Sequence, residues 1–304
     1  IICNFLIFGY NNYMLNIIVA PYEICDKGES YTKKIVSYLK NEKVEFSVYF
    51  SRTLDDITTS VQEILALGET EFVVVGNDVV LNKFLNAVKE VGKIKLGIIP
   101  TNKHDDFAEF LGISSNPIQA IKDILEKHIE EVDYLIMNDQ IVLNNILVGA
   151  SAEIFEIYNQ YKIKNSFTQK IATMQYGDKF EGIILNFDFK SNKIKNENIF
   201  ELSIANGGLS RKKHISPLAN VKDGLMNFNY TTILQKNERK KYLNLFNSGK
   251  QIYNNNTKQH WTNQLRITNE DNRIKAIVDG TLLNLEEINV QVVENGLKLY
   301  TKET

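Results

Sequence analysis

Two polar corners follow buried apolar runs in the first part of the sequence. The first, after VVV, covers Gly76 to Val80, and the second, after GIIP, covers Thr101 to Asp106. Asp78 and Asp106 stand where helices are expected to begin, and carboxylates that meet at one edge of a parallel sheet can hold Mg²⁺, which commonly arrives with phosphate groups. The competing interpretation is that both aspartates cap the helices that follow, a more frequent role for aspartate at such positions.

Neither standard phosphate-binding motif occurs at these corners. The sequence contains no GxxxxGK[ST] and no GxGxxG at a turn between a strand and a helix. A nucleotide site at this position would therefore have to bind phosphate through a different sequence motif.

The segments that carry the corners alternate between short apolar runs and amphipathic stretches from residue 14 to about residue 130. The apolar runs are LNIIVA, VEFSVYF, EFVVVG and KLGIIP. Helical spacing appears between them, for instance in the i, i+3, i+4 and i+7 series Leu81, Phe84, Leu85 and Val88. Alternation of this kind predicts a parallel α/β sheet covered by helices.

After about residue 131 the pattern changes to strand-like runs joined by long polar connections. DYLIMN, FEGIILNFDF and IFELSIANGG are examples, and no helix is expected between them. The sequence thus predicts a two-domain fold, with a parallel α/β domain over residues 14–130 and an antiparallel, β-sandwich-like domain over residues 131–290. Residues 291–304 are predicted to form a strand that either ends the fold or returns to the first domain.

Composition limits the class of partner. The 304 residues are 43% hydrophobic and 24% charged, with a formal net charge of −2, so no global positive field favours nucleic acid, and any membrane contact must be local. Cys3 and Cys25 are too few for a disulfide framework or a thiolate zinc site and fit a reducing compartment. We therefore expect a cytoplasmic protein, with peripheral membrane contact and a homodimer left open.

The first thirteen residues, IICNFLIFGYNNY, are apolar. They lack a basic n-region and fall short of the about 20 residues needed to span a bilayer. Met14 follows at once and opens MLNIIVAP, a natural first strand. We interpret residues 1–13 either as residues that precede the native start or as a loose arm.

Six segments in the same order resemble the diacylglycerol kinase catalytic domain of the lipid kinase family. VVVGNDVVLNKFLNAV is similar to the segment around GGDGTLNE in that family, and LGIIPTNKHDDFAEFLGI is similar to GIIPxGTxNDFAR. Weaker likenesses join APYEICDKG to NPxSGxG, LNNILVGASAEI to FLNVAGIGFDA, SPLANVKDGLMN to PxAxxDDGxLD, and AIVDG to the final DGE motif. The resemblance covers the chain from Met14 onward.

The resemblance implies an ATP- and Mg²⁺-dependent kinase that phosphorylates a diacylglycerol-like lipid entering between the domains. It makes Asp279 the base that removes the proton from the lipid hydroxyl, and Asp78, Asp106 and Asp223 the Mg²⁺ positions. The positions implied to contact the nucleotide are Gly76, Asn77, Asp78, Val79, Val80, Thr101, Asn102, Lys103, Asp105 and Asp106.

The chain departs from the family motifs where those motifs touch phosphate and metal. Glycines are replaced by Asn77, Val79 and Asn102, threonines by Val80 and Lys103, an asparagine by Asp105, and the glutamate of DGE by Thr281. Phosphoryl transfer depends on positioning and charge neutralisation. If each lost contact weakens the transition state by about 2–3 kcal/mol, two losses remove roughly a thousandfold in rate.

Three functions follow from these observations. The first is a lipid kinase that uses Asp279, Asp78 and Asp106. The second is a pseudokinase that keeps the fold as a lipid- or partner-binding module, and the third is an NAD kinase-like enzyme with a soluble acceptor. The VKDGL and VDG segments, which resemble lipid kinase motifs, favour a lipid kinase over an NAD kinase-like enzyme.

Overall fold

The computed structural model describes residues 14–102, 105–176, 179–190, 192–210 and 213–303. The predicted arm, residues 1–13, and the predicted contact residue Lys103 lie outside the described residues. The chain forms two compact units, of which the first runs to Val132 and resumes at Asn295, and the second covers Asp133–Glu294. The chain passes between the units twice, within strands β5 (Ile129–Met137) and β17 (Glu287–Tyr300).

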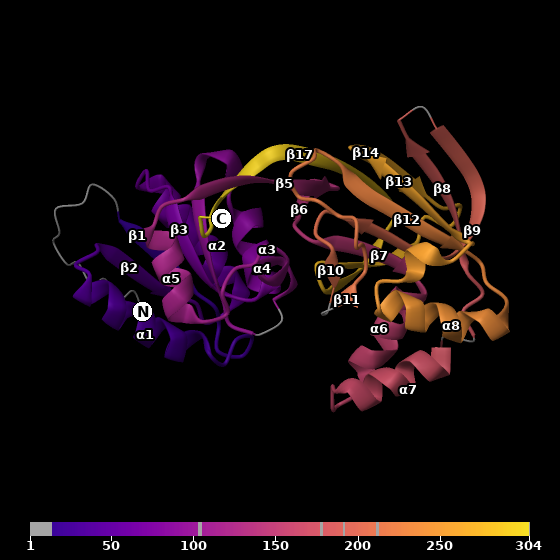
Figure 1. The fold of residues 1–304 in the computed structure, drawn as a ribbon, viewed down its shortest axis with the longest axis horizontal. Helices are drawn as coiled ribbons and strands as arrows, with labels where there is room; N and C mark the ends of the chain where they lie inside the picture. Colours follow the sequence, from indigo (N-terminus) through magenta and orange to yellow (C-terminus); the bar gives the residue numbers. More distant parts are fainter. Residues whose placement is uncertain (1–13, 103–104, 177–178, 191, 211–212, 304) are drawn as a thin grey trace. The chain divides into compact units, whose positions relative to one another are not determined.

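The first unit is a parallel sheet flanked by helices (Figure 1). Its strands follow the order β17-β4-β3-β1-β2, and the pairs are parallel throughout. Its elements are β1 (Leu15–Val19), α1 (Gly28–Asn41), β2 (Phe46–Phe50), α2 (Leu54–Ala66), β3 (Glu71–Gly76), α3 (Asp78–Ala87), the 3-10 turn η1 (Val91–Lys93), β4 (Lys95–Pro100), α4 (Asp106–Phe110) and α5 (Pro117–Leu125). The predicted parallel α/β arrangement is confirmed.

Apolar strand residues explain why this sheet is covered on both faces. Val73 and Val75 of β3 are buried in a cluster with side chains from α1 and α5. Phe72 of the same strand points to the other face, where its ring meets Phe84 of α3 edge to face at 5.2 Å. Alternate residues of β3 therefore pack on opposite helical layers, as a doubly covered strand requires.

The last strand of the chain belongs partly to this sheet. Lys298 and Leu299 of β17 pair in parallel with β4. Lys127 contacts the Glu71 carboxylate and donates a hydrogen bond to Tyr300 Oη at 3.2 Å. These contacts tie the end of β17 to the start of β3, so the C-terminal segment returns to the first unit.

The second unit is built on antiparallel strands (Figure 1). β9 lies against β7, β8 and β12, β13 follows β12, and β14 joins β8 to β17. The elements are β6 (Gln140–Val142), β7 (Asn145–Gly149), α6 (Ala150–Gln160), α7 (Ser166–Tyr176), β8 (Ile183–Phe189), β9 (Asn192–Ala205), β10 (Leu209–Ser210), β11 (Lys213–His214), β12 (Met226–Thr232), α8 (Lys236–Asn247), the 3-10 turn η2 (Gln251–Tyr253), β13 (Thr257–Thr262), β14 (Gln264–Thr268), β15 (Ile274–Val278) and β16 (Thr281–Leu285). The predicted antiparallel sheet is confirmed.

The expectation that no helix interrupts the second domain is wrong. Helices α6, α7 and α8 gather together in this unit (Figure 1). Phe155 of α6, Ala172 of α7 and Phe246 of α8 are buried in one apolar cluster against the sheet. The helices thus cover apolar sheet surface that a lone sheet would leave exposed. No helix in the described part of the chain is long and apolar enough to cross a membrane.

Candidate functional site

The first corner is a capped helix N-terminus rather than a glycine loop. β3 ends at Gly76, and α3 begins two residues later at Asp78. Asn77 lies between them, and its side-chain Oδ1 accepts a hydrogen bond from the Val80 N–H at 3.1 Å. Val79 is part of α3, so this valine adopts a helical conformation and needs no positive φ. The replacements of glycine are therefore compatible with the local backbone.

The space above Gly76 is filled by a side chain. Val80 is fully buried. A Cβ atom built on Gly76 would lie 2.6 Å from Val80 Cγ1 and 2.8 Å from Val80 Cβ, closer than real contacts allow. The valine thus packs its methyl groups on the corner where the family motif carries a hydroxyl.

Asp78 links the first corner to the second. Its Oδ2 accepts a hydrogen bond from the backbone N–H of Phe107 at 3.3 Å, in the first turn of α4. The cap of Asp78's own helix is supplied by Asn77 instead. Asp106 opens α4 and is buried. Two of the predicted metal positions are therefore brought to neighbouring helix starts.

The second corner is held by Asp105, which is buried. Its Oδ2 accepts a hydrogen bond from the Asn102 N–H at 3.1 Å. Burial raises the pKa of the Asp105 carboxyl from 3.8 to about 6; the Asn102 hydrogen bonds oppose the shift and the charge of Asp106 adds to it. The carboxylate that replaces the family's asparagine is therefore a buried group whose charged form is disfavoured near the start of α4.

Cys25 is a residue of this site that the sequence did not single out. It lies in the segment between β1 and α1, where its backbone N–H donates to the Pro21 carbonyl at 2.9 Å. The thiol is buried beside the Thr101 side chain and the Asn77 backbone, and this burial raises its pKa. The only signal in the sequence was the likeness of APYEICDKG to a glycine-rich family segment. In the structure, Cys25 lies beside Asn77 of the first corner and Thr101 of the second.

Asp279, the predicted base, lies at the tip of a hairpin in the second unit. Asp279 and Gly280 have φ of 43° and 83° and join β15 to β16, with Val278 paired to Thr281. Two consecutive positive φ values are typical of a two-residue hairpin turn, for which Asp-Gly is a favoured sequence. The predicted catalytic motif is thus also a turn motif.

Both carboxylate oxygens of Asp279 accept hydrogen bonds from the backbone. Oδ2 accepts from the Leu143 N–H at 2.7 Å, and Oδ1 accepts from Asn144 and Asn145 at 2.9 and 3.0 Å. In return the Asp279 N–H donates to the Asn145 carbonyl at 3.1 Å. These hydrogen bonds hold the carboxylate in one orientation beside residues 143–145.

Asp223, the third predicted metal position, is exposed in the second unit. Its Oδ1 accepts a hydrogen bond from the Leu225 N–H at 3.0 Å. The next residue, Gly224, donates its N–H to the buried carboxylate of Asp133 at 2.8 Å. The local role of Asp223 is an Asx turn. Within the described residues, no three His, Cys, Asp or Glu side chains are grouped so that they could hold a metal ion.

Comparison with models of known protein families gives a match to the part of the chain that contains both corners. The model of the diacylglycerol kinase catalytic domain matches residues 15–137, which include both corners. Over these residues the chain is similar to the diacylglycerol kinase catalytic domain. A diacylglycerol kinase of Staphylococcus saprophyticus subsp. saprophyticus is 24% identical over 191 residues, spanning 61% of this chain and 63% of that relative. The match thus covers less than two thirds of the relative's length.

Solved structures extend the likeness of fold to nearly the whole chain. The crystal structure of a diacylglycerol kinase from Bacillus anthracis str. Sterne gives a TM-score of 0.73 at 17% identity and covers 97% of this chain and 98% of that chain. An NAD kinase from Archaeoglobus fulgidus, solved with ATP, gives a TM-score of 0.53 at 12% identity, over 95% of this chain and 94% of that chain. Both likenesses concern the fold alone.

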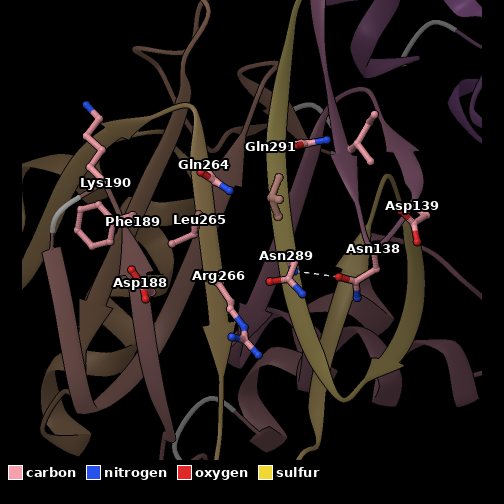
Figure 2. A pocket seen from close by; sticks show the side chains of 12 residues that line it. Asn138, Asp139, Asp188, Phe189, Lys190, Gln264, Leu265, Arg266, Asn289 and Gln291 are labelled. Carbon is pink, nitrogen blue, oxygen red and sulfur yellow. Dashed lines mark hydrogen bonds between the residues drawn. The ribbon is translucent and has the colours of Figure 1, made fainter.

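A polar hollow in the second unit is separate from the family motifs. It has a volume of about 490 Å³ and lies on β8, β14 and β17 (Figure 2). Arg266 faces it and pairs with Glu287 through Nη2 at 2.7 Å, and the Asn289 N–H donates to Asn138 Oδ1 at 2.8 Å. The polar side chains along it are exposed, so it is an open sheet face and includes none of the predicted site residues.

An apolar cavity lies among the helices of the second unit. It has a volume of about 60 Å³ and is lined by side chains of α6, α7 and α8, including Phe155, Thr173 and Phe246. Ser151, Gln169 and Ser210 add polar atoms to its wall. Pockets for apolar ligands commonly combine such a wall with a few polar groups. This volume leaves little room for a whole acyl chain unless the helices move apart.

Proposed function

We propose that this chain is a lipid kinase of the diacylglycerol type in which phosphoryl transfer is impaired. The observation that carries the proposal is the packing of Val80 on Gly76 at the first corner. In the family motif a threonine hydroxyl stands at residue 80 and can donate to phosphate, whereas a buried isopropyl group cannot. The Asn77 side chain also uses the Val80 N–H, one of the amides that a helix start offers to an anion.

ATP would lie against the two corners in this proposal. Thr101, Asn102 and Lys103 would contact its phosphates from the second corner, with Lys103 supplying a positive charge. The donors at the first corner are fewer than in the family motif, so the residues present fit the phosphates only in part. Phosphate charge would also meet the carboxylate of Asp105, which the family motif lacks.

Mg²⁺ would be held by Asp78 and Asp106, because carboxylate oxygens and water are the ligands that this ion prefers. When bound, the ion would neutralise phosphate charge. Asp78 would have to share its carboxylate with the Phe107 N–H. Asp223 would hold a separate structural ion through its exposed carboxylate. The replacement of the DGE glutamate by Thr281 removes a carboxylate from this chemistry.

Asp279 would act as the base toward the lipid hydroxyl. The backbone N–H groups of residues 143–145 hold the carboxylate in one orientation. A base whose oxygens already accept these hydrogen bonds has less capacity to accept a further one from the lipid hydroxyl, which is consistent with slow transfer. The limiting case, in which transfer is absent, is a pseudokinase that binds lipid.

A lipid acceptor is favoured over a soluble one such as NAD. The agreement of fold is greater with the diacylglycerol kinase than with the NAD kinase. The apolar cavity among α6, α7 and α8 also suits an apolar ligand better than a dinucleotide. Opening of these helices would extend the cavity for an acyl chain.

Calorimetric titration of Mg²⁺ and ATP into the purified chain tests the proposal. The unaltered chain is compared with the variant Asn77→Gly, Val79→Gly, Val80→Thr, which restores the family corner. Asn86→Gly, on the exposed side of α3 away from the corner, is the matched control for glycine in this helix. Both proteins are then assayed for transfer of labelled phosphate to diacylglycerol in mixed micelles.

We expect weak ATP binding and slow transfer from the unaltered chain, and at least about a tenfold gain in both for the restored corner, because one recovered phosphate contact is worth more than 1.4 kcal/mol. Binding by the restored corner without any transfer by either protein would select the pseudokinase. Tight binding and fast transfer by the unaltered chain would contradict the impairment. Phosphorylation of NAD rather than lipid would overturn the acceptor.

A further inference from the structure

Asp279 holds the backbone of residues 143–145 through its carboxylate and its own N–H group. The three N–H groups of the segment donate to the carboxylate at 2.7, 2.9 and 3.0 Å. The Asn145 carbonyl accepts a hydrogen bond from the Asp279 N–H at 3.1 Å. The carbonyls of Leu143 and Asn144 remain, and buried carbonyls are almost always hydrogen-bonded. The donors to these two carbonyls therefore show what else fixes the segment.

Asn206 donates to both remaining carbonyls. Its side-chain Nδ2 donates to the Leu143 carbonyl at 2.9 Å. Its backbone N–H donates to the Asn144 carbonyl, also at 2.9 Å. Residues 143–145 are thus held by Asp279 through their N–H groups and by Asn206 through two of their carbonyls.

The side chain of Asn206 is itself fixed to the framework of the second unit. Its Nδ2 donates a second hydrogen bond, to the Asp133 carbonyl at 2.9 Å. Asp133 is buried on β5, where its N–H donates to the Val221 carbonyl at 2.7 Å and its carboxylate accepts from the Gly224 N–H at 2.8 Å. An amide NH₂ group has two hydrogens to donate. The Asn206 side chain therefore cannot rotate without losing both hydrogen bonds.

The two segments approach each other closely at Gly207. The N–H of this glycine adds a second hydrogen bond to the Asn144 carbonyl, at 3.0 Å. A Cβ atom built on Gly207 would lie 2.2 Å from Asn144 Oδ1, closer than real contacts allow. Both Asn144 and Asn206 are buried. Residues 143–145 therefore have no room to shift toward Asn206.

We propose that Asn206 is a positioning residue for phosphoryl transfer, which fixes residues 143–145 and, through them, the carboxylate of Asp279. Three N–H groups hold a carboxylate in one orientation only while the backbone that carries them is itself held. Asn206 supplies this support through the carbonyls of the same segment. A misplacement of about 1 Å at a reacting group can lower a rate about a hundredfold, so the support contributes to catalysis without any contact with the substrate.

This role of Asn206 rests on the proposed function, because Asn206 can position a base only if Asp279 acts as one. The support itself requires neither nucleotide nor lipid. A measurement on the chain alone therefore reports on the support, and the transfer assay reports on its use in catalysis.

Two variants separate the hydrogen bonds of Asn206 from the volume of its side chain. Asn206→Ala removes the amide that donates to the carbonyls of Leu143 and Asp133. Asn206→Asp keeps the shape of the side chain but turns an oxygen instead of an NH₂ group toward these carbonyls. A residue that only filled space would tolerate the aspartate better than the alanine, whereas a positioning residue loses its effect in both variants.

Asn16 on β1 provides the matched control in the first unit. Like Asn206 it is fully buried, and its Nδ2 donates to the carbonyls of Met14 and Glu71 at 3.4 and 3.2 Å. Asn16→Ala and Asn16→Asp therefore remove the same number of hydrogen bonds, and the second introduces the same buried carboxyl group. An effect that both pairs of variants share is a general loss of stability.

Amide hydrogen exchange, resolved by NMR on the full chain, gives the first readout. We expect the N–H groups of residues 143–145 to exchange at least about tenfold faster in both Asn206 variants, because the segment opens locally once its support is lost. Phe228 on β12 lies in the core of the same unit, and its exchange rate should change less. Neither Asn16 variant should alter exchange at residues 143–145.

The transfer assay gives the second readout, in the background Asn77→Gly, Val79→Gly, Val80→Thr. Both Asn206 variants should lower kcat at least about tenfold and leave the KM for ATP unchanged, because both corners belong to the first unit. The two Asn16 variants should keep the kcat of the background protein.

Unchanged exchange at residues 143–145, an equal rise at Phe228, or an unchanged kcat in the Asn206 variants would overturn the proposal. A kcat that falls in Asn206→Ala but not in Asn206→Asp would reduce Asn206 to a residue that fills space. Absence of transfer by the background protein itself would refute the lipid kinase instead, and the exchange rates would still decide whether Asn206 holds residues 143–145.

Discussion

Val80 lies over Gly76 so closely that no side chain fits at residue 76. Its Cγ1 atom would be 2.6 Å from a Cβ atom on that glycine, and Val80 is fully buried. The close approach places valine methyl groups at the junction of β3 and α3, where a phosphate-binding corner needs exposed donors. The packing therefore adds to the stability of the first unit and leaves no hydroxyl donor at residue 80.

Gly76→Ala should destabilise the chain because its new methyl group meets Val80. We expect the free energy of unfolding to fall by about 1–3 kcal/mol, the usual range for an overpacked core. Adding Val80→Ala should offset part of this loss, since it removes the atoms that clash. Urea unfolding of both single variants and of the double variant gives the coupling energy. Strict additivity of the two changes would contradict the packing.

Asp105→Asn should stabilise the protein at neutral pH. The pKa of this carboxyl is raised from 3.8 to about 6 by burial. The folded state therefore binds a proton that the unfolded state has released between these values, and stability declines as pH rises through this window. Asparagine carries no charge and can still accept from the Asn102 N–H, so the free energy of unfolding at pH 7.5 should rise by about 1–3 kcal/mol.

Asp56→Asn provides a control of opposite sign. Asp56 accepts hydrogen bonds from the N–H groups of Arg52 and Thr53 at 2.8 and 3.0 Å, and these bonds hold its pKa below 3.8. Its contribution to stability is present above that value and is lost as pH falls, so the substitution should destabilise at neutral pH. Melting temperatures measured from pH 2 to 8 should show the gain from Asp105→Asn growing between pH 3.8 and about 6, and the loss from Asp56→Asn disappearing below pH 3.8. A pH-independent effect of Asp105→Asn would refute the buried charge.

The sequence was sufficient to predict the first sheet but not the helices of the second unit. Apolar runs such as EFVVVG that alternate with amphipathic helices are typical of strands in a parallel sheet covered by helices, and β3 forms there. Helix α6 contains Ile154, Phe155 and Tyr158, whose spacing is helical, yet it follows the strand run NILVG without a polar break. A strand that continues directly into a helix gives no boundary signal, so α6 was missed.

Residue spacing predicted where the two corners lie, but not how their side chains pack. The order of motifs brought both corners to the ends of β3 and β4, where Asp78 and Asp106 lie. The burial of Val80 and Cys25 depends on side-chain directions that residue spacing does not determine. The Asp-Gly turn signal at Asp279 was readable in the sequence as a hairpin, but the family resemblance assigned it a catalytic role instead.

Cys25 should resist thiol reagents in the folded protein. Its side chain is buried beside Thr101, and burial raises its pKa, so the reactive thiolate is both rare and shielded. In the Cys3→Ser variant, modification by dithionitrobenzoate should be at least about a hundredfold slower than in urea, since it requires local opening. A native rate near that of the unfolded chain would mean that the two corners separate readily.

Asp279 should contribute to folding as well as to any catalysis. Asp279→Asn keeps a residue that tolerates the φ of 43° but turns an NH₂ group toward an N–H donor, so unfolding should become easier by about 1–3 kcal/mol. Asp279→Ala loses all three hydrogen bonds and strains the turn, and its loss should reach about 3–5 kcal/mol. Asp271→Asn, at an exposed turn of the same unit, is the matched control. If Asp279→Asn left the free energy of unfolding unchanged but abolished phosphoryl transfer, the carboxylate would serve catalysis alone. If the free energy of unfolding fell for Asp279→Asn and fell further for Asp279→Ala, the carboxylate would instead hold residues 143–145 in place.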